Sequence, residues 1–282
     1  NIHIRNRFFF RLKPFQNNKK RRCFSKTMSL TVIPIKADRK NSKFILFDEI
    51  CKSLDKNNLS LQDGDVLVIS SKFVSQSQGR VLDTRSIMPS RDSQKLSERF
   101  RVEPKLSEAI IRESDRIFGG ISGFVLASSD QVLAPNAGID KSNTGGSKLI
   151  LYPNKPYLVA EQIKRKFFLI LSIHVGVIIV DSRLMPSRMG TIGITIGCAG
   201  IEPLTDMRGQ KDLDGNSLKV TFQATSDNLA SIANHKMGEG SESQPFAIVR
   251  DSESKLTNRQ IQHDEMTISH EQCVYIRGFE KR

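Results

Sequence analysis

The 282-residue sequence has no tryptophan, only four cysteines and no long apolar stretch. The cysteines are scattered and form no CxxC pair, so we interpret them as reduced thiols of a cytoplasmic protein. The longest apolar run, residues 167–180, is interrupted by Ser172 and His174. A membrane-spanning helix needs about 20 apolar residues. We therefore expect no membrane partner.

The common nucleotide and metal motifs are also missing. There is no GxxxxGK[ST], no GxGxxG, no HExxH and no serine nucleophile elbow. Residues 145–148 (GGSK) resemble a P-loop only superficially, because the first glycine is absent at the required spacing. His263, His270 and Cys273 have a spacing that suits a metal, but a solvated polar tail is the favoured interpretation. Generic motifs therefore indicate no specific activity.

Basic residues are abundant and unevenly distributed. The chain has 43 Lys+Arg and 30 Asp+Glu, a formal net charge of +13, and residues 1–27 hold nine of the basic residues and no acidic one. We interpret residues 1–27 as an over-long gene model or disordered extension, with a targeting or nucleic-acid-binding arm as the alternative. The folded domain is expected at 28–250, and 251–282 as a loosely attached polar tail. The body of the chain is nearly balanced in charge, so nucleic acid is not an expected partner.

Hydrophobic periodicity predicts both strands and helices. Helices are expected over 44–54, on both sides of Pro104, over 157–168 and over 226–237. Apolar and β-branched runs predict strands at 31–35, 66–69, 124–127, 131–134, 175–180, 218–224 and 246–249. The elements do not alternate strictly as βαβ units. The pattern therefore favours an α+β fold, with mixed or antiparallel sheets and flanking helices.

Three acidic residues lie in conspicuous places. Asp140 is in a polar loop after a predicted strand, Asp181 closes the apolar strand 175–180, and Glu239 is between glycines at a predicted helix end. Hard cations such as Mg²⁺ and Mn²⁺ prefer oxygen ligands of this kind. The alternatives are that each aspartate only caps a turn or a helix and that Glu239 is a solvated loop residue. Convergence of the three carboxylates is needed for a metal site.

Several longer segments occur together in a characteristic order. They are Asp65–Lys72 (DVLVISSK) with Gly79-Arg80, Asn136–Asn143 (NAGIDKSN), Gly176–Ser182 (GVIIVDS), Pro186-x-Arg188-x-Gly190, Gly209–Gly215 (GQKDLDG), Met237–Gly240 (MGEG) and Pro245–Arg250 (PFAIVR). Over residues 29–250 the chain resembles the coenzyme F420-0:L-glutamate ligase (gamma-glutamyl ligase) family. This combination is far more specific than any single segment.

The resemblance implies a non-P-loop α+β fold and an intertwined homodimer. It implies a carbon-nitrogen ligase that uses GTP to join L-glutamate to the phospholactyl carboxylate of a deazaflavin precursor, coenzyme F420-0, with further γ-linked glutamates as an extension. The expected cofactors are two divalent ions, Mg²⁺ or Mn²⁺, with K⁺ as an additional cation. The reaction is expected to pass through an acyl phosphate. This chemistry is typical of archaea and actinobacteria, so an archaeal source is expected.

The same resemblance assigns roles to individual residues. Asp140, Asp181 and Glu239 are the implied catalytic metal ligands, with Ser182 as a further ligand where the family usually has threonine. The implied nucleotide contacts are Ser71, Lys72, Asn143, Gly238, Gly240, Ser241 and Gln244. Arg183 and Arg188 are candidates for contact with an anionic substrate, with a surface charge as the alternative for each.

The chain departs from the family pattern at several positions near the expected site. Residues 37–40 (ADRK) replace a glycine-containing segment, Gln76 stands where a basic residue is usual, and Asp251 follows Arg250 where glycine is common. The usual Gly-Arg is not reproduced after Ser182. These differences bear on substrate, nucleotide preference and activity more than on the fold. A same-fold ligase with another acceptor, or a non-catalytic nucleotide-binding relative, are the competing hypotheses.

Overall fold

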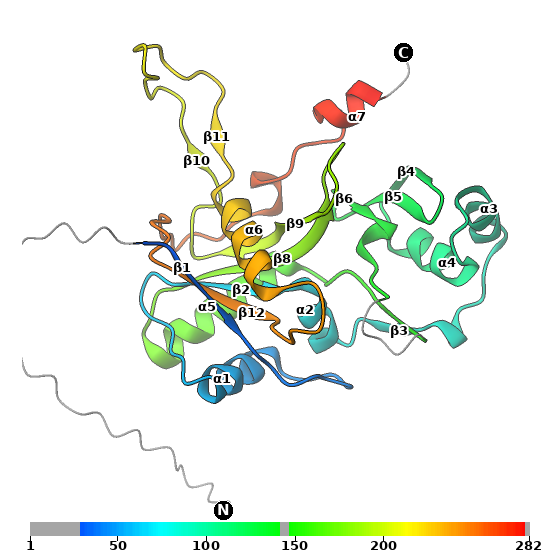
Figure 1. Cartoon of the computed structure of the whole chain (residues 1–282), viewed down its shortest axis with the longest axis horizontal. Helices are drawn as coiled ribbons and strands as arrows, with labels where there is room; N and C mark the ends of the chain where they lie inside the picture. The colour runs from blue at the N-terminus through cyan, green and yellow to red at the C-terminus, as the bar shows by residue number, and fades with distance from the viewer. Residues whose placement is uncertain (1–28, 142–146, 280–282) are drawn as a thin grey trace, which may run out of the picture.

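The computed structural model describes residues 29–141 and 147–279 (Figure 1). Its helices are α1 (Leu46–Lys56), α2 (Ser71–Gln78), α3 (Arg91–Phe100), α4 (Pro104–Glu113), α5 (Pro156–Leu171), α6 (Thr225–Met237) and α7 (Val274–Phe279). Its strands are β1 (Thr31–Ile35), β2 (Val66–Ser70), β3 (Val81–Asp83), β4 (Arg116–Ile121), β5 (Phe124–Ser129), β6 (Val132–Pro135), β7 (Lys148–Ile150), β8 (Gly176–Leu184), β9 (Thr191–Ala199), β10 (Thr205–Asp206), β11 (Phe222–Gln223) and β12 (Phe246–Arg250). No helix in these described ranges is long and apolar enough to cross a bilayer.

A five-stranded mixed sheet forms the centre, in the order β1-β12-β2-β8-β9. β2 and β8 pair in parallel, whereas the other neighbours are antiparallel. The Val- and Ile-rich strands β2, β8 and β12 are buried because helices cover both faces of the sheet. The expected α+β class with mixed and antiparallel sheets is therefore confirmed.

The two faces of this sheet bury different clusters. Ile69, Ile179 and Phe246 point to the face covered by α1, α2 and α5, where Phe47 and Phe167 pack with ring centroids 5.0 Å apart. On the opposite face lies α6, which buries mostly small side chains (Figure 1). Small residues let a helix approach a sheet closely, so α6 and the loop that follows it are held against the strands.

A β-bulge changes the direction of side chains along β9. Ile179 pairs with Gly197 and Val180 pairs with Thr195, so Ile196 is an extra residue without a partner on β8. Side chains alternate along a strand, and one extra residue reverses that alternation. As a result, Gly197 lies against Pro156 of α5, whereas Gly193 lies against Ala230 of α6.

Two smaller parts adjoin the central sheet. The three-stranded sheet β4-β5-β6 packs with α3 and α4 around a separate apolar cluster that includes Phe100, Ile110 and Val125. The β10–β11 pair forms an arm that projects away from the remainder of the described chain (Figure 1). β3 and β7 form a short antiparallel ladder, and β3 follows the C-terminal end of α2.

The predicted elements are mostly found, with informative exceptions. The strand predicted over 218–224 is wrong in extent, because only Phe222–Gln223 is strand, on an arm without a buried face. β8 continues to Leu184, so Asp181 lies within the strand and does not close it. Ser71 and Lys72 begin the helix α2, which the sequence patterns did not predict.

The segment after β12 makes defined contacts. Leu256 forms an isolated bridge with Ile201, and Ile261 is buried. Arg259 forms ion pairs with Glu202 at 2.5 Å and with Glu265 at 2.6 Å. These contacts attach residues 251–266 to the α6 face of the sheet.

Candidate functional site

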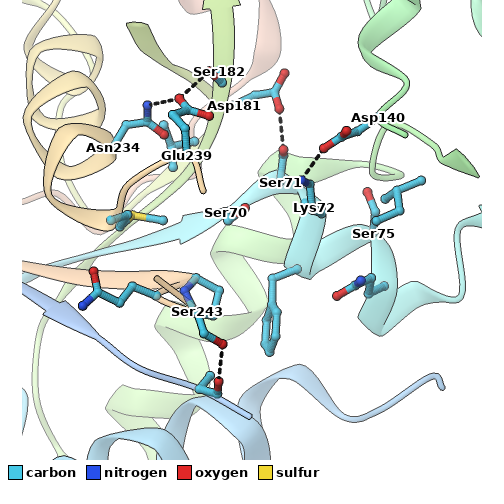
Figure 2. Close-up of a pocket in the computed structure, with 18 of the residues that line it drawn as sticks. Ser70, Ser71, Lys72, Ser75, Asp140, Asp181, Ser182, Asn234, Glu239 and Ser243 are labelled. Atoms are coloured by element: carbon cyan, nitrogen blue, oxygen red, sulfur yellow. Dashed lines mark hydrogen bonds and ion pairs between the residues drawn. The ribbon is translucent and has the colours of Figure 1, made fainter. Parts of the chain in front are cut away.

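A cavity of about 370 Å³ opens where β2 ends and α2 begins, beside β8 (Figure 2). Segments far apart in the chain line it: 37–40, 70–76, 138–140, 150–153, 180–182 and 234–245. Crevices at the carboxyl ends of strands are common binding sites because loops leave the sheet there. The cavity is therefore the candidate active site.

The first turn of α2 supplies two polar side chains. Ser71 Oγ donates a hydrogen bond to Asp181 Oδ1 at 2.5 Å, and Lys72 forms an ion pair with Asp140. Ser71 is buried, and the side chain of Lys72 is about a third exposed (31%). Two of the three predicted carboxylates are thus held by consecutive residues of one helix.

Asp181 is also paired with a buried arginine. The Arg183 guanidinium forms an ion pair with Asp181 Oδ2 and stands 5.7 Å from the ring centre of Tyr152. The side chain of Arg183 is only 5% exposed, and no acceptor in the described structure bonds its Nε or its Nη2. Burial likewise leaves the Tyr152 hydroxyl without a partner among those residues and raises its pKa above the ordinary value. Arg183 thus lies behind the cavity wall, next to Gly138.

Of the three predicted carboxylates, Glu239 is the exposed one. Its Oε1 accepts hydrogen bonds from Ser182 Oγ at 2.6 Å, Asn234 Nδ2 at 2.8 Å and Thr191 Oγ1 at 3.3 Å. These donors come from β8, α6 and β9, so Glu239 connects three elements; Figure 2 shows its bonds to Ser182 and Asn234. Its partners are neutral, unlike those of Asp140 and Asp181.

The loop that follows α6 closes one side of the cavity. It begins at Gly238, whose φ of +80° is a conformation that favours glycine. Ser243 is bonded twice to Ala37: its Oγ donates to the Ala37 carbonyl at 2.9 Å, and its carbonyl accepts from the Ala37 N–H at 3.0 Å. The Pro245 carbonyl accepts from the Ser70 N–H. These bonds therefore fix the loop to the segment after β1 and to the end of β2.

The donor set suits hard cations chemically. Carboxylate and hydroxyl oxygens of Asp140, Asp181, Ser182 and Glu239 face one cavity, and Mg²⁺ and Mn²⁺ prefer oxygen ligands. Within residues 29–141 and 147–279, no three His, Cys, Asp or Glu side chains are gathered into a metal-sized group. Each carboxylate is bonded instead to the protein donors described above. Cation binding therefore requires carboxylate oxygens to exchange these partners for the ion.

Most of the predicted site residues are brought together. The predicted residues that line the cavity are Ser71, Lys72, Asp140, Asp181, Ser182, Gly238, Glu239, Gly240, Ser241 and Gln244. Arg183 is buried behind the wall and Arg188 is exposed elsewhere on the chain, so neither lines it. Asn143 lies outside the described residues. The roles of all these residues as ligands or contacts stay predictions.

Sequence reasoning missed three residues with clear positions at the site. Asn234 and Thr191 hold Glu239, and Tyr152 covers Arg183. Asn234 lies three residues before Met237 on the predicted helix, so its position near the helix end was a usable signal. Thr191 and Tyr152 carried no such signal, because their roles depend on contacts between distant segments.

Known proteins resemble this chain over most of its length. A model of the family described as F420-0:Gamma-glutamyl ligase matches residues 35–251. A protein of Methanocaldococcus jannaschii named coenzyme F420:L-glutamate ligase is 36% identical over 224 residues, which cover 77% of this chain and 90% of the relative. Proteins with the same name from Methanopyrus kandleri (35% identical, 70% of this chain and 78% of the relative) and Halobacterium salinarum (33%, 68% and 77%) also match.

Proposed function

Because the chain belongs to the F420-0:gamma-glutamyl ligase family and is a ligase, we propose that it joins L-glutamate to the carboxylate of coenzyme F420-0 at the expense of GTP. The acceptor carboxylate oxygen attacks the γ-phosphorus, GDP leaves, and an acyl phosphate forms. The glutamate amine then attacks the acyl carbon and inorganic phosphate leaves. Further γ-linked additions repeat the same two steps.

One observation carries this proposal: three carboxylates from distant segments line the same cavity as Lys72 and the glycine-flanked loop 238–245. A triphosphate and a carboxylate repel each other, so a phosphoryl-transfer site must supply positive charge and N–H donors. Lys72 provides an ammonium, and the loop brings backbone close to the cavity. The position of Lys72 at the start of α2 suits contact with phosphate.

We propose that Asp140, Asp181, Ser182 and Glu239 hold two Mg²⁺ or Mn²⁺ ions, with K⁺ as an additional cation. Bound divalent ions would neutralise charge on the triphosphate and orient it for in-line transfer. Neighbouring side chains of the chain orient these carboxylates. Ser71 and Arg183 orient the carboxylate of Asp181. Asn234 and Ser182 orient the carboxylate of Glu239. Ser71, Gly238, Gly240, Ser241 and Gln244 would then border the nucleotide.

We also propose that the active form is an intertwined homodimer. The β10–β11 arm supports this proposal, because it projects from the chain with exposed apolar side chains such as Leu213 and Val220 (Figure 1). A projecting arm with apolar side chains gains stability when a second surface covers it.

The test is a direct assay of the purified chain. Incubation with F420-0, L-glutamate, GTP and Mn²⁺ should increase the acceptor mass by one glutamyl residue and release GDP and phosphate. ATP in place of GTP tests the nucleotide preference. A folded chain that forms no product with either nucleotide contradicts the proposal.

Glu239→Gln is the sharpest variant for the site. The substitution keeps the side-chain shape and leaves no charged partner unpaired, since Glu239 is bonded to hydroxyl and amide groups. Loss of an electrostatic group at a transferring phosphoryl should lower kcat by about 100-fold or more, with an unchanged melting temperature. Mn²⁺ titration should show weaker binding. The exposed Glu98→Gln on α3 is the matched control, and equal activity of both variants would contradict the role of Glu239.

A further inference from the structure

A second cavity of about 230 Å³ adjoins the candidate active site. The two cavities share four lining residues: Arg39, Lys40, Gln76 and Ile150. The second cavity is otherwise lined by residues 41–43, Gly79, Val81, Asp83 and Lys148. A ligand that enters the active-site cavity can therefore extend into this second one, which we call the basic annex.

The annex is strongly cationic. Arg39, Lys43 and Lys148 line it together with Lys40, whose ammonium is already paired with Glu49, and Asp83 is the one carboxylate among its described lining residues. The charge of Asp83 is already engaged, because Arg85 donates to both of its carboxylate oxygens, at 3.0 Å and 2.6 Å. The Lys43 and Lys148 side chains are exposed to solvent and accessible to a ligand. The annex therefore favours anions.

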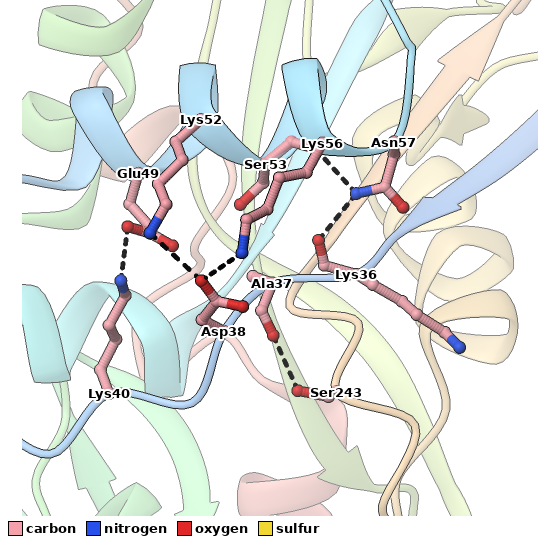
Figure 3. Close-up of polar contacts among 10 residues, drawn as sticks. All are labelled: Lys36, Ala37, Asp38, Lys40, Glu49, Lys52, Ser53, Lys56, Asn57 and Ser243. Carbon is pink, nitrogen blue, oxygen red and sulfur yellow. Dashed lines mark hydrogen bonds and ion pairs between the residues drawn. The ribbon is translucent and has the colours of Figure 1, made fainter.

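The segment that carries three of these cations is anchored at both ends, and Figure 3 shows the contacts at its start. Asp38 accepts from Lys56 at 2.6 Å and from Lys52 at 3.1 Å, and Lys40 pairs with Glu49 at 2.5 Å. After Lys43, the ring of Phe44 packs on Phe73 with centroids 4.7 Å apart. These contacts fix the backbone on either side of Arg39 and Lys43. The backbone that carries these cations is thus held next to the active-site cavity at both ends.

We propose that the basic annex binds the anionic chain of the acceptor, behind the carboxylate that reacts. This inference rests on the proposed function. The reacting carboxylate must lie in the active-site cavity, so the phosphate of the phospholactyl group follows close behind it. When the acceptor already carries γ-linked glutamates, each linked residue keeps a free α-carboxylate. A row of ammonium groups on flexible stems accommodates such anions at variable positions.

The nucleotide is the competing anion. Transfer of a phosphoryl group requires donors fixed within hydrogen-bond reach, such as backbone N–H groups and the start of a helix. The active-site cavity has both, in the loop 238–245 and the first turn of α2. The annex has long, exposed side chains instead. Its chemistry therefore fits an acceptor chain that must bind, be extended and leave.

The experiment compares three Michaelis constants in Lys43→Glu and Lys148→Ala. Alanine is chosen at position 148 because Lys148 pairs across the ladder with Asp83, where a glutamate would add repulsion. Lys36→Glu is the matched control, since Lys36 is in the same segment but its side chain points away from the cluster in Figure 3 and it lines neither cavity. Each annex variant should raise the KM for F420-0 and for its monoglutamyl product by roughly threefold to tenfold, as expected for loss or reversal of a partly exposed charge.

The outcomes separate this inference from the proposed function. Supporting results are a raised acceptor KM that depends on ionic strength, with unchanged KM values for GTP and glutamate and an unaffected Lys36→Glu. A raised KM for GTP would assign the annex to the triphosphate, and a raised KM for glutamate would assign it to the incoming amino acid. Either result, or no change in any KM, overturns the inference. Wild-type protein without product would instead contradict the proposed function.

Discussion

At the scale of single residues, the pair Arg183–Asp181 stands out because it buries opposite charges beside the candidate site. The side chains are 5% and 16% exposed. Breaking a buried pair by removing one partner is costly because the other charge stays buried and unpaired. Part of the arginine's hydrogen-bonding capacity is already unused in the described structure. Asp181 therefore has a structural role in addition to its proposed catalytic one.

We expect Asp181→Asn to lower the free energy of unfolding by about 3 kcal/mol, because the Arg183 charge loses its partner. The double variant Asp181→Asn/Arg183→Met should recover most of that loss, since methionine can fill the space against Tyr152 without a charge. Urea unfolding of the wild type, both single variants and the double variant forms the required thermodynamic cycle.

Additive losses in this cycle would contradict the coupling of the two residues. A double variant that regains stability without regaining activity would separate the two roles of Asp181. Loss of activity in Asp181→Asn alone would not distinguish the structural role of Asp181 from the catalytic one. For this reason Glu239→Gln is the better test of catalysis.

At the scale of elements, β9 owes its place between two helices to glycines. A Cβ at Gly193 would lie 2.6 Å from the Ala230 carbonyl oxygen and 2.6 Å from Asn234 Cβ. Such distances are far shorter than any contact between unbonded atoms of these kinds. The glycine thereby lets α6 come close enough for Asn234 to reach Glu239.

Gly193→Ala should therefore push α6 away from β9. Overpacking of this kind costs about 1–3 kcal/mol of stability. Activity should fall as well, because Asn234 and Glu239 move with the helix and its loop. Urea unfolding and kcat measurements check both effects. Gly278→Ala on α7 is the control, since a Cβ there meets no atom within 4 Å, and an equal loss in both variants would show that close packing at β9 is not the cause.

The elements also show how far the sequence could predict this structure. Helices cover both faces of the sheet, so β2, β12 and the first half of β8 are apolar runs that the sequence indicated, whereas the polar second half of β8, from Asp181 on, was not expected as strand. Helix α2 was missed because its buried side chains include the small polar Ser71, Ser75 and Ser77, which resemble a loop in the sequence. The short strands β3 and β7 were missed for lack of any periodic pattern.

The site was predictable to the extent that its residues lie in continuous motifs. The three acids and the loop 238–244 were identified in this way. The family resemblance made Arg183 a candidate for contact with an anionic substrate, with a surface charge as the alternative, and neither anticipates a buried side chain. Its burial depends on Tyr152 and Asp181 together, and one sequence contains no information on that contact.

At the scale of the whole molecule, the segment after β12 covers part of the α6 face. Deleting residues 252–282 would expose Ile201 and remove Ile261, both nearly inaccessible to solvent, together with the Arg259 ion pairs. Burying one such isoleucine is worth about 1.5–3 kcal/mol. We expect the melting temperature to fall by about 5–10 °C.

Thermal unfolding of two truncated chains checks this expectation. A chain that ends at residue 273 lacks α7 and the end of the sequence; Val274 and Tyr275 of α7 are exposed, whereas Ile276 is buried. This shorter truncation removes fewer buried contacts and should lower the melting temperature by about 2–4 °C, less than the longer one. If the tail were loosely attached, both truncated chains would instead melt at the same temperature as the full-length chain.

The bonds between Ala37 and Ser243 join positions 206 residues apart at the rim of the cavity. During synthesis, the first of these positions leaves the ribosome long before the second has been translated. The complete rim of the candidate active-site cavity therefore cannot form on a growing chain until almost the entire family-matched region has emerged. A nascent chain consequently lacks the closed rim of this cavity until late in its synthesis.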